Sequence, residues 1–164
     1  MKVQKRRRKE NKTDYLKRLK LLKSNSPRVV FRKTNRYIIA QYATSEEAQD
    51  RIVLGANSKD LMKYGWPENF KGSLKSIPAS YLTGLLLGKK IIGKKLETPI
   101  ADFGMYRNQH KNRSYAFLKG LIDAGLKLKC SKDVFPEEGK ITGKNLKKDF
   151  SKNFDEIKNK ISKK

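Results

Sequence analysis

The sequence predicts an α/β fold: a small mixed sheet with an antiparallel meander packed by helices, plus a basic N-terminal arm and a helical C-terminal tail. Three observations lead to this prediction. β-prone runs occupy much of residues 28–57, helical apolar patterns lie on either side of them, and cations crowd the two ends of the chain. A length of 164 residues allows one compact domain with arms and is too short for two ordinary domains.

We divide the chain into a basic arm (residues 1–12), an α/β domain (residues 13–126) and a basic C-terminal extension (residues 127–164). The arm reads MKVQKRRRKENK and has almost nothing to bury, so alone in water it should be disordered. It is either an RNA-binding arm or a solubilising tail. Three adjacent arginines favour RNA, because guanidinium groups suit phosphate geometry and stack on bases.

A helix should begin near residue 13, where Thr13 or Asn11 can cap it and Asp14 lies in the first turn. It carries one apolar stripe, with members spaced i, i+4 and i+7: Tyr15, Leu19 and Leu22. We expect this stripe to pack on the domain, which would leave the basic faces of the helix free. Pro27 ends the helix, because the residue before a proline is disfavoured in the α region.

Residues 28–33 (RVVFRK) and 37–43 (YIIAQYA) are strongly β-prone. The intervening Thr34-Asn35-Arg36 predicts a hairpin, since Asn tolerates the left-handed turn conformation. The period of two places Val30 and Arg32 on one face and Val29, Phe31 and Lys33 on the other. Four cations are expected to crowd one end and one face of the hairpin: Arg28, Arg32, Lys33 and Arg36.

A third strand over about residues 51–57 should extend the meander. Residues 58–76 are looser, with turns at their glycines and proline. Tyr64 and Trp66 stand beside lysines in this segment. They could stack on bases, or Trp66 could cover an edge of the core, and the sequence leaves both open.

The next helix should open at Ser76 or Ile77, with Pro78 in its first turn, and run to about residue 94. Gly84 and Gly88 would allow it to approach the sheet closely. Four apolar side chains can face that sheet: Leu82, Leu85, Leu86 and Ile92. This segment is too short and basic for a membrane span, which needs ~20 apolar residues.

Residues 98–105 predict a buried strand, followed by a polar basic loop over residues 106–113. A last core helix over residues 115–124 would be capped by Ser114 and ended by Gly125 as its C′ residue. Beyond that point the chain loses its core pattern. A loop and one or two short helices laid on a surface are expected there.

Charge indicates the partner. Lys and Arg total 40 against 16 Asp and Glu, which gives a net charge of +24. A chain this basic repels itself unless a polyanion compensates, and nucleic acid is the usual one because each neutralised phosphate releases counterions. An anionic membrane would require an amphipathic helix or a lipid anchor. The remaining alternative is a generic Lys-rich surface, although such surfaces mix both signs.

Catalytic and metal-binding patterns are missing from the sequence. The single cysteine, Cys130, and single histidine, His110, exclude an internal disulfide, a Cys-cluster zinc site and a His pair. No phosphate-binding or dinucleotide-binding glycine motif is present. Asp102 ends a predicted strand, as active-site carboxylates do, but a salt bridge or a backbone hydrogen bond would also account for it. Lysines around Cys130 could lower its pKa. We therefore expect no enzyme, cofactor or metal.

Two long runs carry a family resemblance. RRRKENKTDYLKRLKLLKS (6–24) and PRVVFRKTNRYIIAQ (27–41) resemble the N-terminal part of the archaeal and eukaryotic form of a large-subunit ribosomal protein that binds 5S rRNA, the L-eighteen family. Further segments keep the family's order: SKDLMKYGW, PASYLTGLLLGKK, ADFG and LKGLIDAGL. The loop YRNQHKNRS lacks the Pro-Gly pair that the family often has. The chain also lacks the long C-terminal extension of eukaryotic members, which indicates an archaeal source.

The resemblance implies a structural constituent of the large ribosomal subunit in the cytoplasm. It would anchor 5S rRNA to the large-subunit rRNA in the central protuberance, beside the other 5S-binding large-subunit protein, with no membrane and no small-molecule substrate as partners. The arm and the hairpin would contact RNA through Arg6, Arg7, Arg8, Lys9, Tyr15, Arg18, Arg28, Arg32, Lys33, Asn35 and Arg36.

Three other functions fit a basic surface. An RNA-modifying enzyme would show turnover on rRNA. A DNA-compacting protein would bind duplex DNA as tightly as 5S rRNA. An assembly factor that carries 5S rRNA off the ribosome would not sediment with finished large subunits.

Overall fold

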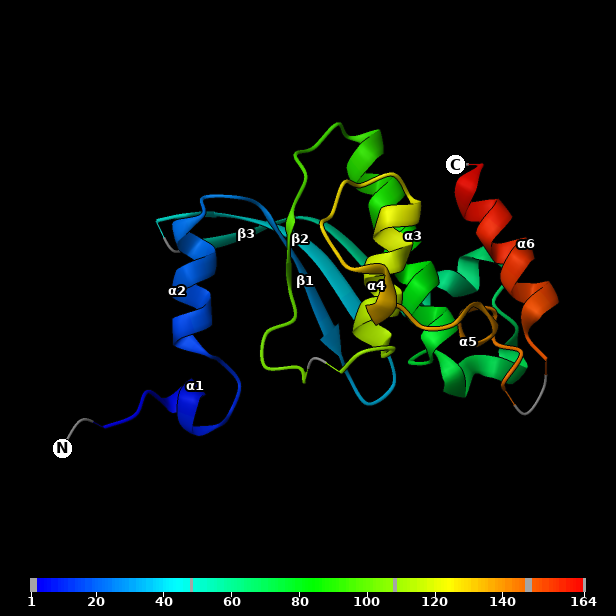
Figure 1. The fold of residues 1–164 in the computed structure, drawn as a ribbon, viewed down its shortest axis with the longest axis horizontal. Coiled ribbons are helices and arrows are strands. Elements are labelled where there is room, and N and C mark those ends of the chain that lie inside the picture. Colours follow the sequence, from blue (N-terminus) through cyan, green and yellow to red (C-terminus); the bar gives the residue numbers. More distant parts are fainter. Residues whose placement is uncertain (1–2, 48, 108, 147–148, 164) are drawn as a thin grey trace.

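A computed structural model describes residues 3–47, 49–107, 109–146 and 149–163 (Figure 1). Its sheet has four strands, in the order β3-β2-β1-β4. The first three strands form the antiparallel meander and β4 runs parallel to β1, so the predicted mixed α/β fold is confirmed. The strands are β1 (Arg28–Lys33), β2 (Ile38–Glu46), β3 (Gln49–Asn57) and β4 (Ile100–Asp102). The α-helices are α1 (Arg6–Lys9), α2 (Tyr15–Lys23), α3 (Ile77–Gly93), α4 (Arg113–Asp123), α5 (Glu138–Thr142) and α6 (Ser151–Ser162). Shorter 3₁₀ helices are η1 (Ser58–Tyr64), η2 (Glu68–Ser73) and η3 (Lys132–Val134).

The predicted hairpin between β1 and β2 is confirmed, and a side chain closes its turn. The Thr34 hydroxyl accepts a hydrogen bond from the Tyr37 N–H (2.9 Å) and donates one to the Tyr37 carbonyl (2.8 Å). β2 and β3 are both longer than predicted and reach Glu46 and Gln49, which pair with each other. The register shifts between Tyr42 and Ala43, and such a bulge bends and twists the ribbon.

One face of the sheet forms the core with α3 and α4, which lie side by side beside the strands in Figure 1. Period two holds here as predicted, since Val29 and Phe31 are each only 1% exposed. Ring contacts extend this layer, because Phe31 packs against Phe117 of α4 with ring centroids 5.2 Å apart. Buried hydrophobic area of this kind is the main stabilising contribution to the fold.

Helix α3 begins as predicted, with the Ser76 hydroxyl accepting from the Ala79 N–H at 3.4 Å and a proline in the first turn. Most of the helix is buried, including the predicted Leu82, Leu85 and Leu86. The prediction for Ile92 is wrong, since 41% of it is exposed. Ile91 takes the buried position instead, because one residue further along a helix turns the side chain by about 100°.

The glycines of α3 serve a helix pair, so the prediction that Gly84 and Gly88 approach the sheet is wrong. A Cβ atom on Gly84 would collide with the Phe117 carbonyl oxygen of α4. The relation is reciprocal, because a Cβ on Gly120 of α4 would collide with the Tyr81 carbonyl of α3. The two backbones therefore touch where neither helix carries a side chain.

Replacing Gly84 by alanine should lower the free energy of unfolding by roughly 1–3 kcal/mol, since the added methyl group forces two packed backbones apart. Urea unfolding followed by circular dichroism measures this. Gly93→Ala is the matched control, because a Cβ there meets nothing within 4 Å and alanine favours a helix over glycine by up to about 1 kcal/mol. Equal losses from the two variants would show that the close approach has no energetic weight.

The segment after α3 departs from prediction in two ways. β4 covers only Ile100–Asp102 and is half-buried, rather than a buried strand over residues 98–105. It stops because the Asp102 carboxylate accepts a hydrogen bond from the Gly104 N–H (2.8 Å) and Gly104 turns the chain with φ +54°. The cap of α4 is Asn112 rather than Ser114, which is buried. Gly125 is the C′ residue as predicted, with φ +114°.

The prediction that the core pattern ends near Gly125 is wrong. Helix α6 packs on α3 (Figure 1). It and its N-cap residue bury four side chains at i, i+4, i+7 and i+11: Phe150, Phe154, Ile157 and Ile161. Trp66 covers this edge of the core, with its ring centroid 4.5 Å from that of Phe150 and its Nε1–H donating to the Phe70 carbonyl (3.0 Å). Among the described residues no helix combines the length and apolar character that a membrane crossing requires.

Candidate nucleic-acid interface

Helix α2 lies across the sheet from α3 and α4, on the face that the main core leaves uncovered (Figure 1). Its N-cap is Asp14, whose carboxylate accepts from the Leu16 and Lys17 N–H groups at 3.0 and 3.2 Å. The predicted caps were wrong: Thr13 instead accepts a hydrogen bond from the Arg7 Nε–H (2.9 Å). The carboxylate of Asp14 suits the positive end of the helix.

The predicted packing of the α2 stripe holds only in part. Tyr15 and Leu22 are half-buried, whereas Leu19 is 52% exposed, and no residue of α2 is fully buried. The surface beneath is mixed, because this face of β1 alternates charged and apolar side chains: Arg28, Val30 and Arg32. From α2, the Lys17 ammonium donates a hydrogen bond to the Gly104 carbonyl at 3.1 Å.

A network of ion pairs lies between α2 and the sheet. Arg28 of β1, with a side chain only 3% exposed, donates to an Asp50 oxygen at 2.5 Å, to an Asp102 oxygen at 3.2 Å and to the Ser45 hydroxyl at 2.9 Å. Arg18 of α2 donates to the second Asp50 oxygen at 2.9 Å. One carboxylate thus binds guanidinium groups from α2 and β1, and the network joins α2 to all four strands.

The surroundings of Asp50 change the pKa of its carboxyl. Partial burial by itself would raise the pKa of its carboxyl. Hydrogen bonds from Ser45 and Arg18, together with the positive charges of Arg28 and Arg18, outweigh burial and hold the pKa below its usual range. The ionised form is therefore favoured in the folded state.

The stability of the protein should consequently depend on the charge of Asp50. A carboxyl whose pKa is lowered by folding stabilises the fold at pH values above its unfolded pKa of about 4, and this stabilisation is lost as pH falls through the lower folded pKa. Free energies of unfolding measured from pH 6 to pH 2.5 should fall less steeply for Asp50→Asn than for the wild type. Parallel curves would show that Asp50 does not contribute to the acid sensitivity.

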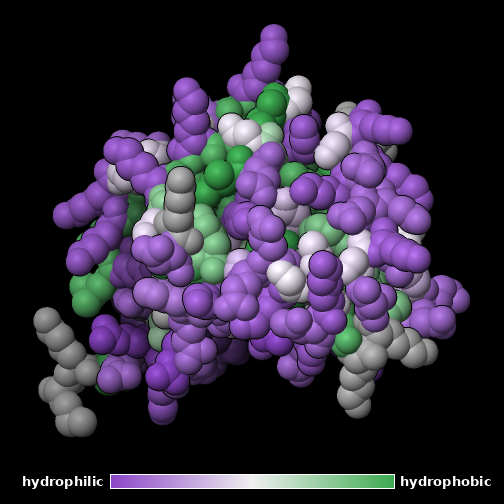
Figure 2. Space-filling view, turned by 45° about the vertical axis from the view of Figure 1, so that its right-hand side comes forward, coloured by the Kyte–Doolittle hydropathy of each residue, from purple (hydrophilic) through white to green (hydrophobic). Residues whose placement is uncertain are grey.

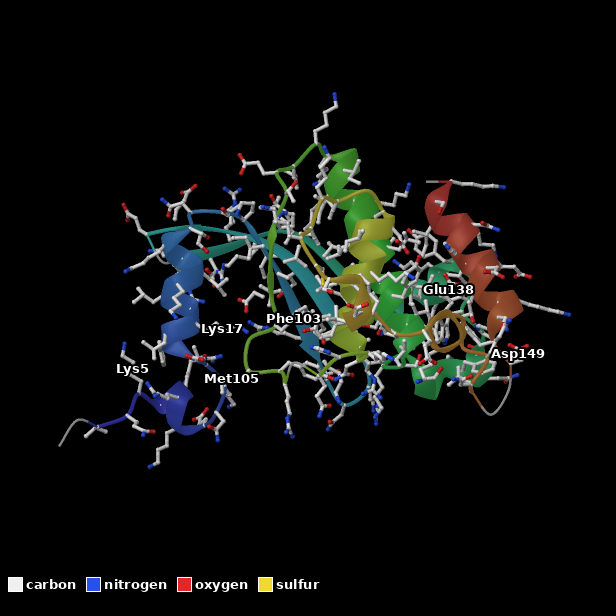
Figure 3. The ribbon with its side chains drawn as sticks, viewed as in Figure 1. Lys5, Lys17, Phe103, Met105, Glu138 and Asp149 are labelled. Carbon is white, nitrogen blue, oxygen red and sulfur yellow. The ribbon has the colours of Figure 1, made fainter. Side chains whose placement is uncertain are left out.

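A groove of about 810 Å³ opens between the arm and α2 on one side and β1 with the loop after β4 on the other. Figure 3 shows Lys17 of α2 beside this opening, with Phe103 and Met105 on the loop across from it. Six cations line it: Arg7, Lys12, Lys17, Arg18, Arg32 and Lys33. Three carboxylates and four aromatic rings also line it: Asp14, Asp50, Asp102, Tyr15, Phe31, Phe103 and Tyr106.

The structure separates the predicted RNA-contact residues into two groups. Most are exposed, on the arm or around the hairpin turn: Arg6, Arg7, Arg8, Lys9, Arg32, Lys33, Asn35 and Arg36. Tyr15 is half-buried, with the Lys5 ammonium 4.7 Å from its ring centroid. Figure 2 shows that one view of the surface is largely hydrophilic, as many exposed cations require.

Arg18 and Arg28 form the second group, because both bind carboxylates. The expectation that Arg28 faces RNA does not fit the structure, since its guanidinium is enclosed by Asp50, Asp102 and Ser45. Asp50 was missed because the third strand was predicted to begin at about residue 51, whereas it begins at Gln49. Both strands run past the predicted bounds, and their register places Ser45 opposite Asp50.

Two residues weighed as catalytic candidates have structural surroundings. Asp102 forms the ion pair and the backbone hydrogen bond that were the alternative to an active-site role. The lysines near Cys130 could have lowered the pKa of its thiol, but burial raises it and outweighs a backbone hydrogen bond from Ser131. Within the described part of the chain, no three His, Cys, Asp or Glu side chains gather as a metal site.

Comparison with known proteins gives consistent matches. A family model described as "Ribosomal large subunit proteins 60S L5, and 50S L18" matches residues 1–100. A protein of Korarchaeum cryptofilum named "Large ribosomal subunit protein uL18" is 45% identical over 145 residues, covering 88% of this chain and 72% of the relative. Proteins of the same name from Methanothrix thermoacetophila and Methanoregula boonei are 42% and 38% identical. Their matches cover 87% and 94% of this chain and 82% and 86% of the relatives.

Proposed function

Because the chain belongs to the uL18 family of large ribosomal subunit proteins, we propose that it binds 5S rRNA and anchors it to the large-subunit rRNA. Family membership makes it a structural protein of the ribosome rather than an enzyme, with ribosomal RNA and ribosomal proteins as partners. It also places the chain in the large subunit of the cytoplasmic ribosome. The anchoring would take place in the central protuberance, beside the other 5S-binding protein of the large subunit.

The observation that carries this proposal is the position of the exposed cations. The arm and the hairpin end flank one groove and present guanidinium and ammonium groups on both of its sides. Base-paired RNA hides its base edges in a deep, narrow groove, so a protein that holds it must contact phosphates, 2′-hydroxyls and overall shape. Spread cations on a rigid scaffold with a projecting arm meet that requirement.

The contact residues follow from exposure. We propose that Arg6, Arg7, Arg8 and Lys9 of the arm bind phosphates, together with Tyr15 beside them. The hairpin would contribute Arg32, Lys33, Asn35 and Arg36. Arg18 and Arg28 would contribute indirectly, because they hold α2 and the sheet in place through Asp50.

Binding to 5S rRNA should weaken steeply with salt. If six or more phosphates are neutralised, affinity falls about 10³-fold or more between 50 and 200 mM monovalent salt, because each contact releases condensed counterions. Filter binding with a 5S rRNA transcript across this range measures the slope. Competition with transfer RNA and with duplex DNA of equal length tests whether folded 5S rRNA is preferred.

Two results would contradict the proposal. An affinity that stays flat as salt rises would exclude binding through phosphates. Equal competition by duplex DNA would favour a general nucleic-acid binder over a 5S rRNA anchor.

A further inference from the structure

The carboxylates on the floor of the groove are paired with arginines that lie beneath them. Asp50 and Asp102 face the groove and would repel an RNA strand if they stood alone. Arg28 binds both carboxylates and Arg18 binds Asp50 a second time, so two guanidinium groups balance two carboxylates. A phosphate approaching the groove therefore meets no unpaired carboxylate from these two residues. The enclosed Arg28 therefore contributes to the groove by binding its carboxylates, and not through the phosphate contact predicted for it.

The rim across from α2 combines apolar surface with positive charge. Met105 is 49% exposed, although it is a large hydrophobic side chain. Tyr106 is half-buried, packs its ring edge-on to Phe31 with centroids 5.8 Å apart, and has the Lys33 ammonium 5.8 Å from its own centroid. A cation beside a fixed aromatic ring is the combination with which proteins hold an unpaired base and its phosphate.

We propose that this groove binds unpaired nucleotides of the RNA, with a base against Met105 and Tyr106 and its phosphates on Lys33 and Arg32. The inference rests on the proposed function and adds the class of ligand to it. The groove is open, has mixed polar and apolar walls, and its volume of about 810 Å³ lies in the range of small-ligand sites, ~300–1,000 Å³.

An unpaired nucleotide fits better than a duplex for a physical reason. A paired helix presents its phosphates on a convex surface and keeps its bases stacked inside, so it could touch the rim but not fill the concavity. Looped or bulged nucleotides can be splayed out and stacked on protein rings. Every acid that lines the groove already accepts a hydrogen bond, from Arg28 and Arg18 or, for Asp14, from backbone N–H groups of α2.

Crosslinking from the groove tests the proposal. The single cysteine allows a specific label, so Met105→Cys is made in a Cys130→Ser background and coupled to an azidophenacyl group. Complexes with a 5S rRNA transcript are irradiated and mapped by primer extension, and the unpaired nucleotides are identified independently by 2′-hydroxyl acylation of the RNA. The matched control is Ile92→Cys, an exposed position of α3 (41% exposed) that does not line the groove.

We expect the Met105 label to crosslink to one or two neighbouring unpaired nucleotides, and the Ile92 label to give no crosslink there. Crosslinks to paired nucleotides or to a second protein chain would overturn the inference. So would a normal complex, seen in a gel shift, without any crosslink. If the unlabelled protein formed no complex with 5S rRNA, the proposed function would fail and this inference with it, and the gel shift distinguishes the two cases.

Substitution of Tyr106 provides a second measurement. Tyr106→Leu should weaken 5S rRNA binding about tenfold, the effect typical of losing one base–aromatic stack. Tyr106→Phe keeps the ring and should bind as the wild type does. Because the ring also packs on Phe31, each variant is first shown to be folded by its thermal transition. A phenylalanine variant as weak as the leucine variant would overturn the stacking role.

Discussion

Replacing Arg28 by methionine is expected to lower the free energy of unfolding by about 3–5 kcal/mol, the usual effect of breaking a buried ion pair by removing one partner. Methionine keeps most of the length of arginine and removes its charge. Asp50 and Asp102 would then lie next to each other without the guanidinium between them, and Asp102 is only 13% exposed. Since Asp50 keeps Arg18 and is 34% exposed, the lower end of that range is expected.

Urea unfolding at pH 7 measures this loss, and the same strand offers a matched control. Arg32 points from the same face of β1 four residues further on, but it is exposed, so Arg32→Met should change the free energy of unfolding by less than about 0.5 kcal/mol. Adding Asp50→Asn and Asp102→Asn to the Arg28 variant should recover part of the loss, because the uncompensated charges are removed. A loss below about 1 kcal/mol for Arg28→Met would contradict the role assigned to the network.

Local patterns predicted most of the fold. The bounds of β1 agree with the run RVVFRK, and α3 starts at the expected Ser-Ile-Pro signal and ends one residue early. In both cases the decisive information lies within a few residues: β-branched and aromatic side chains for the strand, a cap with a proline for the helix. The Thr34 turn is equally local.

Burial of charge was the part that the sequence could not supply. Arg28 looks like its neighbour Arg32 in a list of cations. The difference is that the sheet brings two carboxylates, 22 and 74 positions from Arg28 along the chain, next to the Arg28 guanidinium. The exposure of Leu19 in α2 has the same origin, because whether it packs depends on the polarity of a surface built from other segments.

The tail illustrates a second limit. A helical period of apolar residues is visible in the sequence at Phe150, Phe154, Ile157 and Ile161. The lysines between them suggested a surface segment instead. Their burial against α3 shows that a narrow stripe is enough when the helix that receives it is apolar on nearly every side. The C-terminal segment therefore shares the core of residues 13–126.

Removal of residues 1–12 should weaken binding to 5S rRNA by about a hundredfold at low salt and leave the fold intact. Residues 3–12 are all exposed, so their loss takes no described side chain out of the core. Four consecutive cations, Arg6–Lys9, form a single helical turn and point to different sides of it, which suits an arm lying between RNA strands. A turn this short is not stable on its own, so part of the binding energy would be spent in ordering it.

The salt dependence identifies the mechanism of that loss. Each phosphate contact that disappears should reduce the slope of log affinity against log salt by about 0.7–0.9, so a truncated arm that lost three contacts would flatten the slope by about 2–3. Changing three exposed lysines of the opposite end, Lys152, Lys160 and Lys163, to glutamine removes three positive charges far from the arm (Figure 1). If this control weakened binding as much as the truncation, the overall field of the protein rather than the arm would hold the RNA. If the truncated chain unfolded at a lower urea concentration, the arm would be part of the fold after all.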